Sequence, residues 1–363
     1  MRAVVLVGGE GTRLRPLTLT TPKQMLPIAE ITMVERVLGH LASHGIDEAV
    51  LSLGYRPDAF TDAYPDGVIA GVRSKYAVEP SPLDTAGAIR FAADFDGIDD
   101  TFIVLNGDVL TDFDISGLVA FHRERGAEGT IGLTPVDDPS SFGVVPTDED
   151  GKVTAFIEKP PRDEAPTNFI NAGIYVLEPS VLKRITPGIR VSIEREIFPA
   201  MVADGGLYAQ GSDAYWLDTG TPDAYLRAHR DLISGRRVGP PAPGAVQDPD
   251  LGVGVWTIGE VDVVPRSVTG SLIGRNASVA SDASVSDSVI GANAVIESGA
   301  VISHSVILPG ARIAARATVD HSIIGAAATV GQRCTVSGVS VVGARAVIAS
   351  GTTLDGERYP TGS

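Results

Sequence analysis

Residues 8–18 (GGEGTRLRPLT) carry the first side chains whose types and spacing suit chemistry on phosphates. Three glycines lie within four positions there, at Gly8, Gly9 and Gly11. Because glycine has no side chain, the backbone N–H groups of such a turn can approach a polyphosphate closely. Arg13 and Lys23 add positive charge, and residues 1–30 hold four basic and two acidic side chains in a chain of net charge −16. The segment predicts a local anion-binding site in an acidic protein.

Two common nucleotide-binding motifs do not fit this segment. No Gly-Lys-Ser/Thr follows the glycines, so the loop is not a P-loop. Leu14 stands where a dinucleotide-binding G-x-G-x-x-G motif has its third glycine. The glycines must therefore be interpreted together with the residues that follow them.

The longer string GGxGTRLxPLT…PKxxLP, over residues 8–27, resembles that of the nucleoside-diphosphate-sugar pyrophosphorylases, also called sugar-1-phosphate nucleotidylyltransferases. Other segments typical of this family follow in order, at residues 106–108 (NGD), 142–145 (FGVV), 158–160 (EKP), 171–175 (NAGIY) and 216–220 (WLDTG). The resemblance covers essentially the whole chain, which looks most like actinobacterial mannose-1-phosphate guanylyltransferase-like proteins.

The resemblance implies that an oxygen of a sugar-1-phosphate attacks the α-phosphorus of a nucleoside triphosphate in line and releases pyrophosphate. Such a reaction needs two anions held in line and the charge on the phosphoryl oxygens neutralised. By similarity, Mg²⁺ is the cofactor. The resemblance implies that the reacting phosphates are contacted by Arg13, Lys23 and Lys159, and that the metal is bound by Asp108 and Asp218. It implies nucleotide binding by Gly8, Gly9, Gly11, Thr85 and Gly107. It implies sugar-phosphate binding by Gly143, Glu158, Lys159 and Asn171.

Residues 79–88 (EPSPLDTAGA) occupy the place of the family's base-recognition segment, where Asp84 replaces a glycine of most relatives. A carboxylate at Glu79 or Asp84 can accept hydrogen bonds from guanine N1–H and its exocyclic amine, which favours GTP. Thymine and uracil have no such amine. A second departure is residues 30–33 (EITM), where relatives usually place Lys-Pro-Met; we expect it to alter the start of the following helix rather than the chemistry.

These departures leave the acceptor open. A mannose-1-phosphate-like sugar is favoured, and another hexose-1-phosphate or a sugar-like cyclitol phosphate, such as valienol-1-phosphate, is the alternative. Three other classes also remain: a non-catalytic regulatory subunit that binds nucleotide sugar, a glycosyltransferase, and an acyltransferase that uses His304 or His321 as a base.

The elements that must position these residues alternate between strands and helices. Short apolar, β-branched runs predict strands at residues 3–7, 48–53, 101–105, 129–133 and 170–177, and helices are predicted at 33–43, 85–93, 115–125 and 192–204. This alternation predicts a Rossmann-like α/β domain with a mostly parallel sheet. In such sheets ligands bind beyond the carboxyl ends of the strands, so the loops listed above should meet there.

The C-terminal part of the chain repeats. Ser followed by two apolar residues recurs from Ser271 to Ser340 with spacings of 17, 17, 17 and 18, and aliphatic residues recur every six positions within each unit. The pattern predicts a hexapeptide-repeat parallel β-helix, of the left-handed type, with about five coils. Small residues at the corners, Cys334 among them, should be buried. We expect the β-helix to mediate homo-oligomerisation.

Composition sets the outer limits. Residues 236–250 (RRVGPPAPGAVQDPD) are rich in Pro and Gly and predict a linker between a catalytic domain at 1–235 and the β-helix at 251–363. The charge of −16 disfavours binding to nucleic acid or to an anionic membrane. The single cysteine excludes a disulfide framework, and no apolar run reaches 18 residues. We therefore expect a cytoplasmic enzyme without a membrane span.

Overall fold

A computed structural model describes residues 1–263 and 267–360 of the chain. By their internal contacts the residues form two compact units, the first made of 1–9 and 34–217, the second of 10–33 and the chain from Asp218 onward. The predicted boundaries at 235 and 250 stay a prediction, and residues 264–266 and 361–363 of the predicted β-helix domain lie outside the described residues. Within the described ranges, no helix has the length and apolarity needed to cross a membrane.

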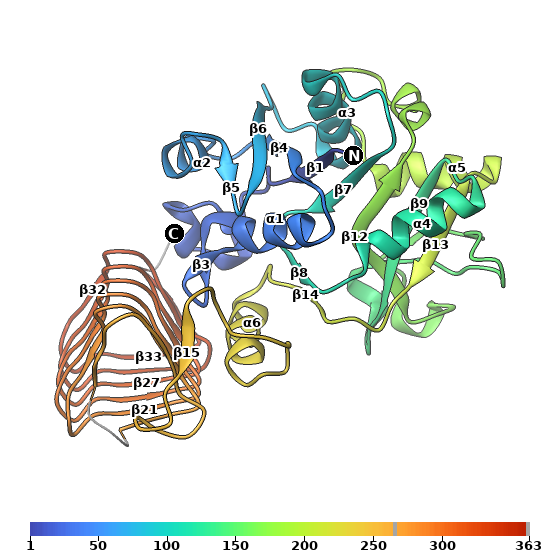
Figure 1. Cartoon of the computed structure of the whole chain (residues 1–363). Coiled ribbons are helices and arrows are strands. Elements are labelled where there is room, and N and C mark those ends of the chain that lie inside the picture. The colour runs from blue at the N-terminus through green and yellow to red at the C-terminus, as the bar shows by residue number, and fades with distance from the viewer. Residues whose placement is uncertain (264–266, 361–363) are drawn as a thin grey trace. The chain divides into compact units, whose positions relative to one another are not determined.

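The first unit is built on a ten-stranded sheet whose main path runs β11-β10-β12-β7-β1-β4-β6-β5, while β9 pairs with β12 and β13 (Figure 1). The central strands β7, β1, β4 and β6 are parallel, and β12 runs antiparallel to β7. The strands are β1 (Ala3–Leu6), β4 (Glu48–Leu53), β5 (Val68–Ile69), β6 (Val72–Val78), β7 (Phe102–Asn106), β9 (Gly129–Pro135), β10 (Gly143–Val144), β11 (Ile157–Glu158), β12 (Phe169–Leu177) and β13 (Leu207–Gly211). The predicted Rossmann-like sheet is confirmed in its parallel central strands, and antiparallel pairings flank them at β12, β10, β11 and β5.

The helices of the first unit are α1 (Met33–Ser43), α2 (Asp58–Ala63), α3 (Asp84–Asp96), α4 (Ile115–Arg125) and α5 (Phe198–Asp204). Helix α3 packs on β1, β4 and β6, and α4 packs on β9, β12 and β13. Local residues determine where α4 begins and ends: the Asp114 carboxylate caps its first turn, and Gly126, in the left-handed region, terminates it. The helix predicted at 192–204 begins instead as a π-helical turn, Ile193–Ile197, before α5. Strands β6 and β13 were not predicted.

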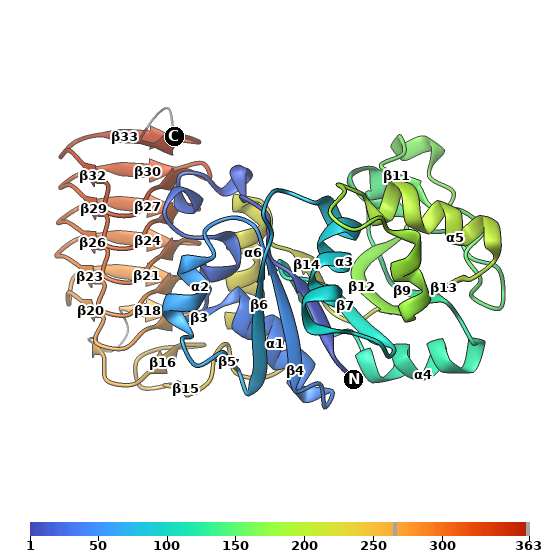
Figure 2. The ribbon, with the colours of Figure 1, turned by 90° about the horizontal axis from the view of Figure 1, so that it is seen from above.

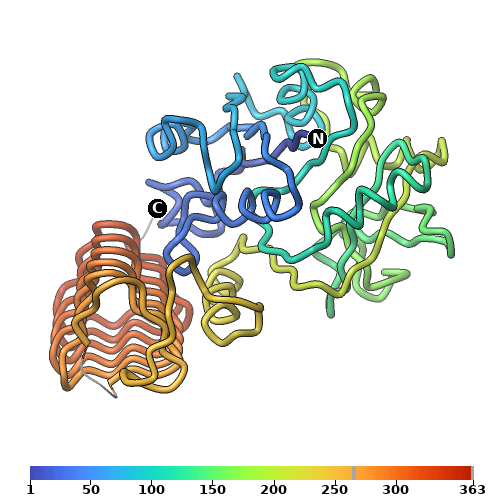
Figure 3. Tube along the Cα trace, in the orientation of Figure 1, coloured from blue at the N-terminus to red at the C-terminus, as the bar shows by residue number. Residues whose placement is uncertain are grey.

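The second unit contains the β-helix, whose strands form three parallel sheets. Figure 2 shows the strands of successive coils stacked in columns, and the trace in Figure 3 shows the coils as a pile of similar loops. The first sheet holds β16 (Trp256–Ile258), β19 (Leu272–Ile273), β22 (Val289–Ile290), β25 (Val306–Ile307), β28 (Ile323–Ile324), β31 (Val341–Val342) and β34 (Arg358–Tyr359), with β15 (Ala245–Gln247) antiparallel at its edge.

The other two sheets of the β-helix have six strands each. One holds β17 (Asp262–Val263), β20 (Ser278–Val279), β23 (Val295–Ile296), β26 (Arg312–Ile313), β29 (Thr329–Val330) and β32 (Val347–Ile348). The other holds β18 (Val268–Thr269), β21 (Ser284–Ser286), β24 (Val301–Ser303), β27 (Thr318–Asp320), β30 (Thr335–Ser337) and β33 (Thr353–Asp355). The aliphatic residues of the repeat form one buried core, and Cys334 is buried among them as predicted. The described chain has one more coil than the repeat indicated, because β16, β17 and β18 precede Ser271.

Residues 10–33 belong to the second unit although they carry the glycine-rich segment. They form three short 3₁₀ turns, at Thr12–Leu14, Leu17–Leu19 and Lys23–Met25, and a small hairpin of β2 (Pro27–Ile28) and β3 (Ile31–Thr32). Helix α6 (Pro222–Ile233) belongs to the same unit, and the Thr221 hydroxyl caps its first turn. Two further short strands are β8 (Val109–Thr111) and β14 (Trp216–Asp218).

Candidate functional site

In the first unit, the loop after β1 passes close to the end of β6. A Cβ at Gly8 would lie 3.2 Å from Glu79 Oε1 and 3.4 Å from the Gly54 nitrogen, so a side chain there would crowd both groups. The Glu79 carboxylate is held in place from two sides, since Oε1 accepts from Ser52 Oγ at 3.0 Å and Oε2 accepts from the Leu83 amide at 3.0 Å. Open space lies where a Cβ of Gly9 would point. Predicted nucleotide residues from two loops thus meet here.

Asp84 and Thr85 begin helix α3. Asp84 has a φ of +60°, in the left-handed region where glycine is favoured, so the chain keeps a glycine-like backbone at this departure from the family pattern. Its Oδ1 accepts from the Thr85 amide at 2.9 Å, and its Oδ2 lies 3.6 Å from Arg190 Nε. The Thr85 hydroxyl donates to Glu194 Oε2 at 2.6 Å. The predicted base-recognition segment is therefore joined to residues 190–194.

Asp108 follows the parallel strand β7, as predicted. The Gly107 amide donates to the Leu6 carbonyl at 2.9 Å, and a Cβ at Gly107 would lie 2.8 Å from that same oxygen. Only glycine allows this approach, which brings the turn carrying Asp108 against the end of β1. Gly173, on the neighbouring strand β12, has a φ of +72° and lies against the Asn106 side chain. The Asn-Gly-Asp segment is thus held by close backbone packing.

The residues of the first unit that are predicted to bind the sugar phosphate also come together. Gly143 and Glu158 are directly paired partners of β10 and β11, and a Cβ at Gly143 would lie 3.1 Å from Glu158 Oε2. The Lys159 amide donates to the Phe142 carbonyl at 3.0 Å, and Lys159 has a φ of +52°. Its Nζ lies 3.6 Å from Glu158 Oε1, and its side chain is 57% exposed. Lys159 therefore offers a reachable cation beside the Glu158 carboxylate.

Asn171 and Tyr175 lie on β12, on either side of a register irregularity in its pairing with β9. Asn171 Nδ2 donates to the Tyr175 hydroxyl at 2.8 Å. Burial raises the pKa of Tyr175, and the charges of Glu194, Glu158 and Asp108 raise it further, while the hydrogen bond from Asn171 lowers it. Carboxylates from three different elements thus contribute to the raised pKa of this one buried phenol.

Tyr175 and Glu194 were not assigned a role from the sequence. Glu194 lies in the π-helical turn, and its Oε2 accepts from Thr85 Oγ1 and from Ser192 Oγ, the latter at 2.8 Å. Single π-helical turns are frequent at functional sites. The available signal was weak: Tyr175 ends the NAGIY segment, and Ser192 precedes a short acidic stretch. The hydrogen bond between Glu194 and Thr85 depends on how distant parts of the chain pack.

The remaining predicted residues, Gly11, Arg13, Lys23 and Asp218, belong to the second unit. Gly11 has a φ of +62°, and a Cβ there would lie 3.0 Å from both Lys23 Cβ and Thr18 Cγ2. The Thr18 hydroxyl donates to the Gly11 carbonyl at 2.8 Å. The glycine-rich turn and the buried Lys23 are therefore packed directly together.

Arg13 and Asp218 meet at Gly220. The Gly220 amide donates to Asp218 Oδ1 at 2.8 Å. A Cβ at Gly220 would lie 2.5 Å from Arg13 Nη2 and 2.8 Å from Asp218 Oδ1. A predicted phosphate-binding cation and a predicted metal-binding carboxylate thus lie around one glycine of the WLDTG segment.

The donor set fits Mg²⁺ held jointly by protein and substrate. Among residues 1–263 and 267–360, no cluster of three or more His, Cys, Asp or Glu is placed to hold a metal by itself. Mg²⁺ in phosphoryl-transfer enzymes is commonly bound by one or two carboxylates together with phosphates and water. Asp108 and Asp218 are of the right chemistry for this arrangement, and both stay predictions as metal ligands.

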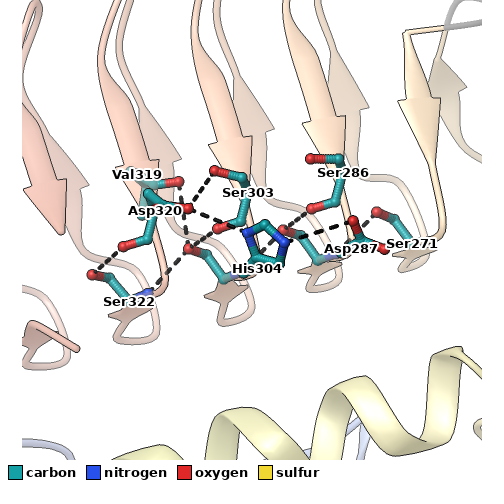
Figure 4. A network of polar contacts seen from close by, with 10 residues as sticks. Ser271, Ser286, Asp287, Ser303, His304, Val319, Asp320 and Ser322 are labelled. Atoms are coloured by element: carbon teal, nitrogen blue, oxygen red, sulfur yellow. Dashed lines mark hydrogen bonds and ion pairs between the residues drawn. The ribbon is translucent and has the colours of Figure 1, made fainter. Parts of the chain in front are cut away.

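The two histidines of the acyltransferase alternative lie at equivalent corners of adjacent β-helix coils, both with positive φ. His304 Nδ1 lies 3.3 Å from Asp320 Oδ1, and Nε2 lies 3.8 Å from Asp287 Oδ2 (Figure 4). These are contacts between stacked corner residues, in agreement with a structural role. They give the acyltransferase alternative no support.

Comparison with known families places these residues in context. The profile of the family described as "Nucleotidyl transferase" matches residues 2–235, and that described as "GMPPB C-terminal domain" matches residues 268–359. The first match contains every predicted site residue.

Two curated relatives illustrate the similarity. The chain is 46% identical over 235 residues to a mannose-1-phosphate guanylyltransferase of Mycobacterium tuberculosis, which is 64% of this chain and 65% of that protein. It is 40% identical over 270 residues to a mannose-1-phosphate guanylyltransferase catalytic subunit beta of Dictyostelium discoideum, 74% of this chain and 72% of that one. The chain thus spans slightly less than two thirds of the mycobacterial relative.

Among solved structures, HddC from Yersinia pseudotuberculosis complexed with GMP-PN is similar, with a TM-score of 0.55 and 28% identity. The similarity covers 63% of this chain and 98% of HddC.

Proposed function

We propose, since the chain belongs to the Nucleotidyl transferase family, that it transfers a guanylyl group from GTP to a sugar-1-phosphate of the mannose-1-phosphate kind and releases pyrophosphate. The observation that carries the proposal is that predicted site residues from separate segments of the first unit meet: a Cβ at Gly8 would lie 3.2 Å from Glu79 Oε1, and Gly143 pairs directly with Glu158. The Thr85 hydroxyl, in the predicted base segment, also donates to Glu194. The relatives named mannose-1-phosphate guanylyltransferases support the choice of substrates.

The chemistry asks the protein to position two anions and to neutralise charge. In-line attack by the sugar-phosphate oxygen forms the new P–O bond as the bond to the leaving pyrophosphate breaks. Lys159, with an exposed ammonium group, would hold the phosphate of the acceptor. Arg13 and Lys23 would bind the phosphates of the nucleotide.

Mg²⁺ would be held by Asp108 and Asp218 together with the substrate phosphates. When bound, the ion neutralises charge on phosphoryl oxygens. The carboxylates' part is to bind and orient it, which explains why acidic groups lie in a site for anionic substrates. This assignment rests on the type of the side chains and on their place in the family motifs.

Guanine would be selected by a carboxylate of the base segment. The Glu79 oxygens each accept one hydrogen bond within the protein, and a carboxylate oxygen has capacity for another. Inosine triphosphate lacks the exocyclic amine of GTP and therefore isolates this contact. Glu79→Gln or Asp84→Asn should reduce the preference for GTP over ITP; an unchanged preference in both variants would remove the carboxylates from base selection.

A pyrophosphate-release screen tests the whole proposal. GTP, ATP, UTP, CTP and dTTP would each be paired with mannose-1-phosphate, glucose-1-phosphate and valienol-1-phosphate. We expect GTP with mannose-1-phosphate to be turned over fastest. Turnover with GTP and only the cyclitol phosphate would favour the alternative acceptor. Binding of GDP-mannose without release from any pair would instead favour a non-catalytic regulatory subunit.

A further inference from the structure

The hairpin that follows Lys23 has an unusual tip. Strands β2 and β3 are joined by Ala29 and Glu30, whose φ values are +47° and +76°. Two-residue hairpin turns with both φ values positive favour Asn and Gly, because a Cβ is unfavourable in the left-handed region. Such a backbone persists at Ala and Glu only where surrounding groups hold it. The contacts of the tip therefore show what the hairpin is attached to.

Helix α6 holds one side of the hairpin. The Ala29 amide donates to His229 Nδ1 at 3.3 Å, and the buried Tyr225 hydroxyl donates to the Pro27 carbonyl. Ala29 itself is fully buried. These contacts fix the first half of the turn but leave the orientation of Glu30 to another partner.

That partner is a turn of the β-helix. Glu30 Oε1 accepts a hydrogen bond from the Ala292 amide at 3.1 Å. A Cβ at Gly274, one coil before, would lie 3.0 Å from Glu30 Cδ, so the carboxyl group fits closely against two coils. The contact joins residues 262 positions apart in the chain.

The hairpin is in turn connected to the phosphate-binding segment. The Leu26 amide donates to the Lys23 carbonyl at 3.1 Å, and the Met33 amide donates to the Leu26 carbonyl at 3.2 Å. Lys23 packs against Gly11 of the glycine-rich turn. A continuous set of contacts thus leads from Ala292 through Glu30 to Lys23.

We propose that Glu30 is a positioning residue, whose carboxylate ties the β2–β3 hairpin to the β-helix turn at Ala292 and so holds Lys23 in place for the nucleotide. The β-helix is then part of the framework of nucleotide binding as well as a separate structural element. This inference rests on the proposed function. It concerns Glu30 itself, which stands at one of the positions where the chain departs from its relatives.

Three substitutions distinguish the effect of losing the hydrogen bond between Glu30 and Ala292 from the effect of backbone strain at residue 30. Glu30→Ala removes the carboxylate and keeps an unfavourable Cβ, whereas Glu30→Gly removes the carboxylate but suits the positive φ. Glu30→Gln keeps an acceptor oxygen. We expect the KM for GTP to rise roughly tenfold in the Ala and Gly variants, as for the loss of one charge-assisted hydrogen bond, and to stay close to the unmodified value in the Gln variant. The KM for the sugar phosphate should not change.

The β-helix side offers a matched pair of variants. Ala292→Pro removes only the N–H that donates to Glu30, and the equivalent position of the next coil is already proline, at Pro309. Ala326 holds the equivalent position in the coil after that of Pro309, and Ala326→Pro makes the same change there and serves as the control. Ala292→Pro should raise the KM for GTP as Glu30→Ala does, and combining the two should add little, because both remove the same contact.

The outcomes are distinct. An unchanged KM for GTP in both Glu30→Ala and Ala292→Pro would overturn the inference. A raised KM for GTP in Glu30→Ala together with a normal one in Glu30→Gly would also overturn it, because backbone strain alone would then explain the effect. Hydrogen exchange at the Ala292 amide tests the hydrogen bond to Glu30 independently of enzyme activity. We expect this exchange to be slow in the unmodified protein and fast in Glu30→Ala. If the unmodified protein releases no pyrophosphate from any substrate pair, the proposed function fails while this exchange measurement still tests the tie.

Discussion

Two regions of the molecule contain dense polar networks, and they are built in opposite ways. In the β-helix, Ser288, Ser305 and Ser322 are buried, and each Oγ donates to a carbonyl two residues earlier in its own coil. The Oγ of Ser288 and of Ser305 also accepts the amide of the serine one coil further on (Figure 4). In the first unit, by contrast, the network around Tyr175 gathers the negative charges of Glu158, Glu194 and Asp108.

The two networks differ in role: we expect the polar groups of the β-helix to stabilise the fold and those of the first unit to take part in the reaction. The serine ladder consists of neutral hydroxyls that satisfy backbone groups, so it stabilises stacking without needing a ligand. The carboxylates of the first unit follow no such repeating pattern, and two of them, Glu158 and Asp108, lie in segments typical of the family. We therefore expect them to serve the reaction rather than folding. Substitutions in the two networks should therefore have opposite consequences.

The largest effect is expected at the metal-binding carboxylates. Asp108→Asn and Asp218→Asn keep the shape of the side chain but remove the charge that would bind Mg²⁺. Turnover should fall by about a hundredfold or more, as for the loss of one main electrostatic group at a reaction centre. Pyrophosphate release measures this, and circular dichroism checks that the variants stay folded.

Asp100→Asn is a suitable control, since Asp100 is exposed and precedes the same strand, β7, that Asp108 follows. It should leave turnover unchanged. Normal turnover and Mg²⁺ binding in Asp108→Asn would show that this carboxylate is not a metal ligand, and the contrast between the two networks would lose its chemical basis.

The next effect concerns the acceptor phosphate. Lys159→Ala removes the cation beside Glu158. The KM for the sugar phosphate should rise roughly tenfold or more, because a charge-assisted contact to phosphate is lost. The KM for GTP should change much less. Lys183→Ala, at an exposed lysine, is the control, and equal rises in both KM values would contradict a selective role for Lys159.

Local patterns in the sequence predicted more of the fold than of the site. The 17-residue spacing was sufficient for the β-helix, because stacking repeats the same burial in each coil. It missed the coil that begins at β16, since Val255 stands there at the position that serine holds in the later coils, before Trp256 and Thr257. Motif residues such as Gly107 were found because they lie in short recognisable segments. Their roles in binding and catalysis stay predictions.

Contacts between distant segments could not be predicted in the same way. Nothing near Glu194 in sequence reveals that its carboxylate accepts from Thr85, 109 positions earlier. The segment at 30–33 was expected to alter the start of the following helix, and helix α1 begins at Met33. The hydrogen bond between Glu30 and Ala292 depends on how the chain packs, so it became visible only in the structure.

A smaller effect, on stability alone, is expected in the serine ladder. Ser305→Ala leaves the Ser322 amide without the oxygen it donates to, whereas Ser322→Ala has no such consequence, because the Ser340 amide donates to the Ser337 carbonyl in the longer, 18-residue coil. Ser305→Ala should therefore lower the free energy of unfolding by about 1–2 kcal/mol more than Ser322→Ala does.

Urea unfolding followed by circular dichroism measures this difference, and the KM values of both variants should be normal. A variant of the ladder that lost activity at full stability would break the proposed separation between the two networks.

The smallest effect is a pH dependence at Glu30. Burial raises the pKa of its carboxyl group above the ordinary value of 4.5, and the hydrogen bond from Ala292 opposes part of this effect. Burial, and after it the charge of Glu30, raises the pKa of the Tyr225 hydroxyl. Ionised Glu30 therefore destabilises the folded protein at pH values above its folded-state pKa, and this penalty disappears below about pH 4.5.

Glutamine cannot ionise, so Glu30→Gln should unfold at a higher temperature than the unmodified protein at pH 7, and the difference should vanish at pH 4. Glu149→Gln, at an exposed carboxylate, should show no such difference at either pH. Thermal unfolding at the two pH values measures both. If Glu30→Gln were less stable at pH 7, the charge of Glu30 would be part of a stabilising structural network like the serine ladder. If it were more stable with a normal KM for GTP, Glu30 would combine an electrostatic cost with a positioning role, unlike the neutral hydroxyls of the serine ladder.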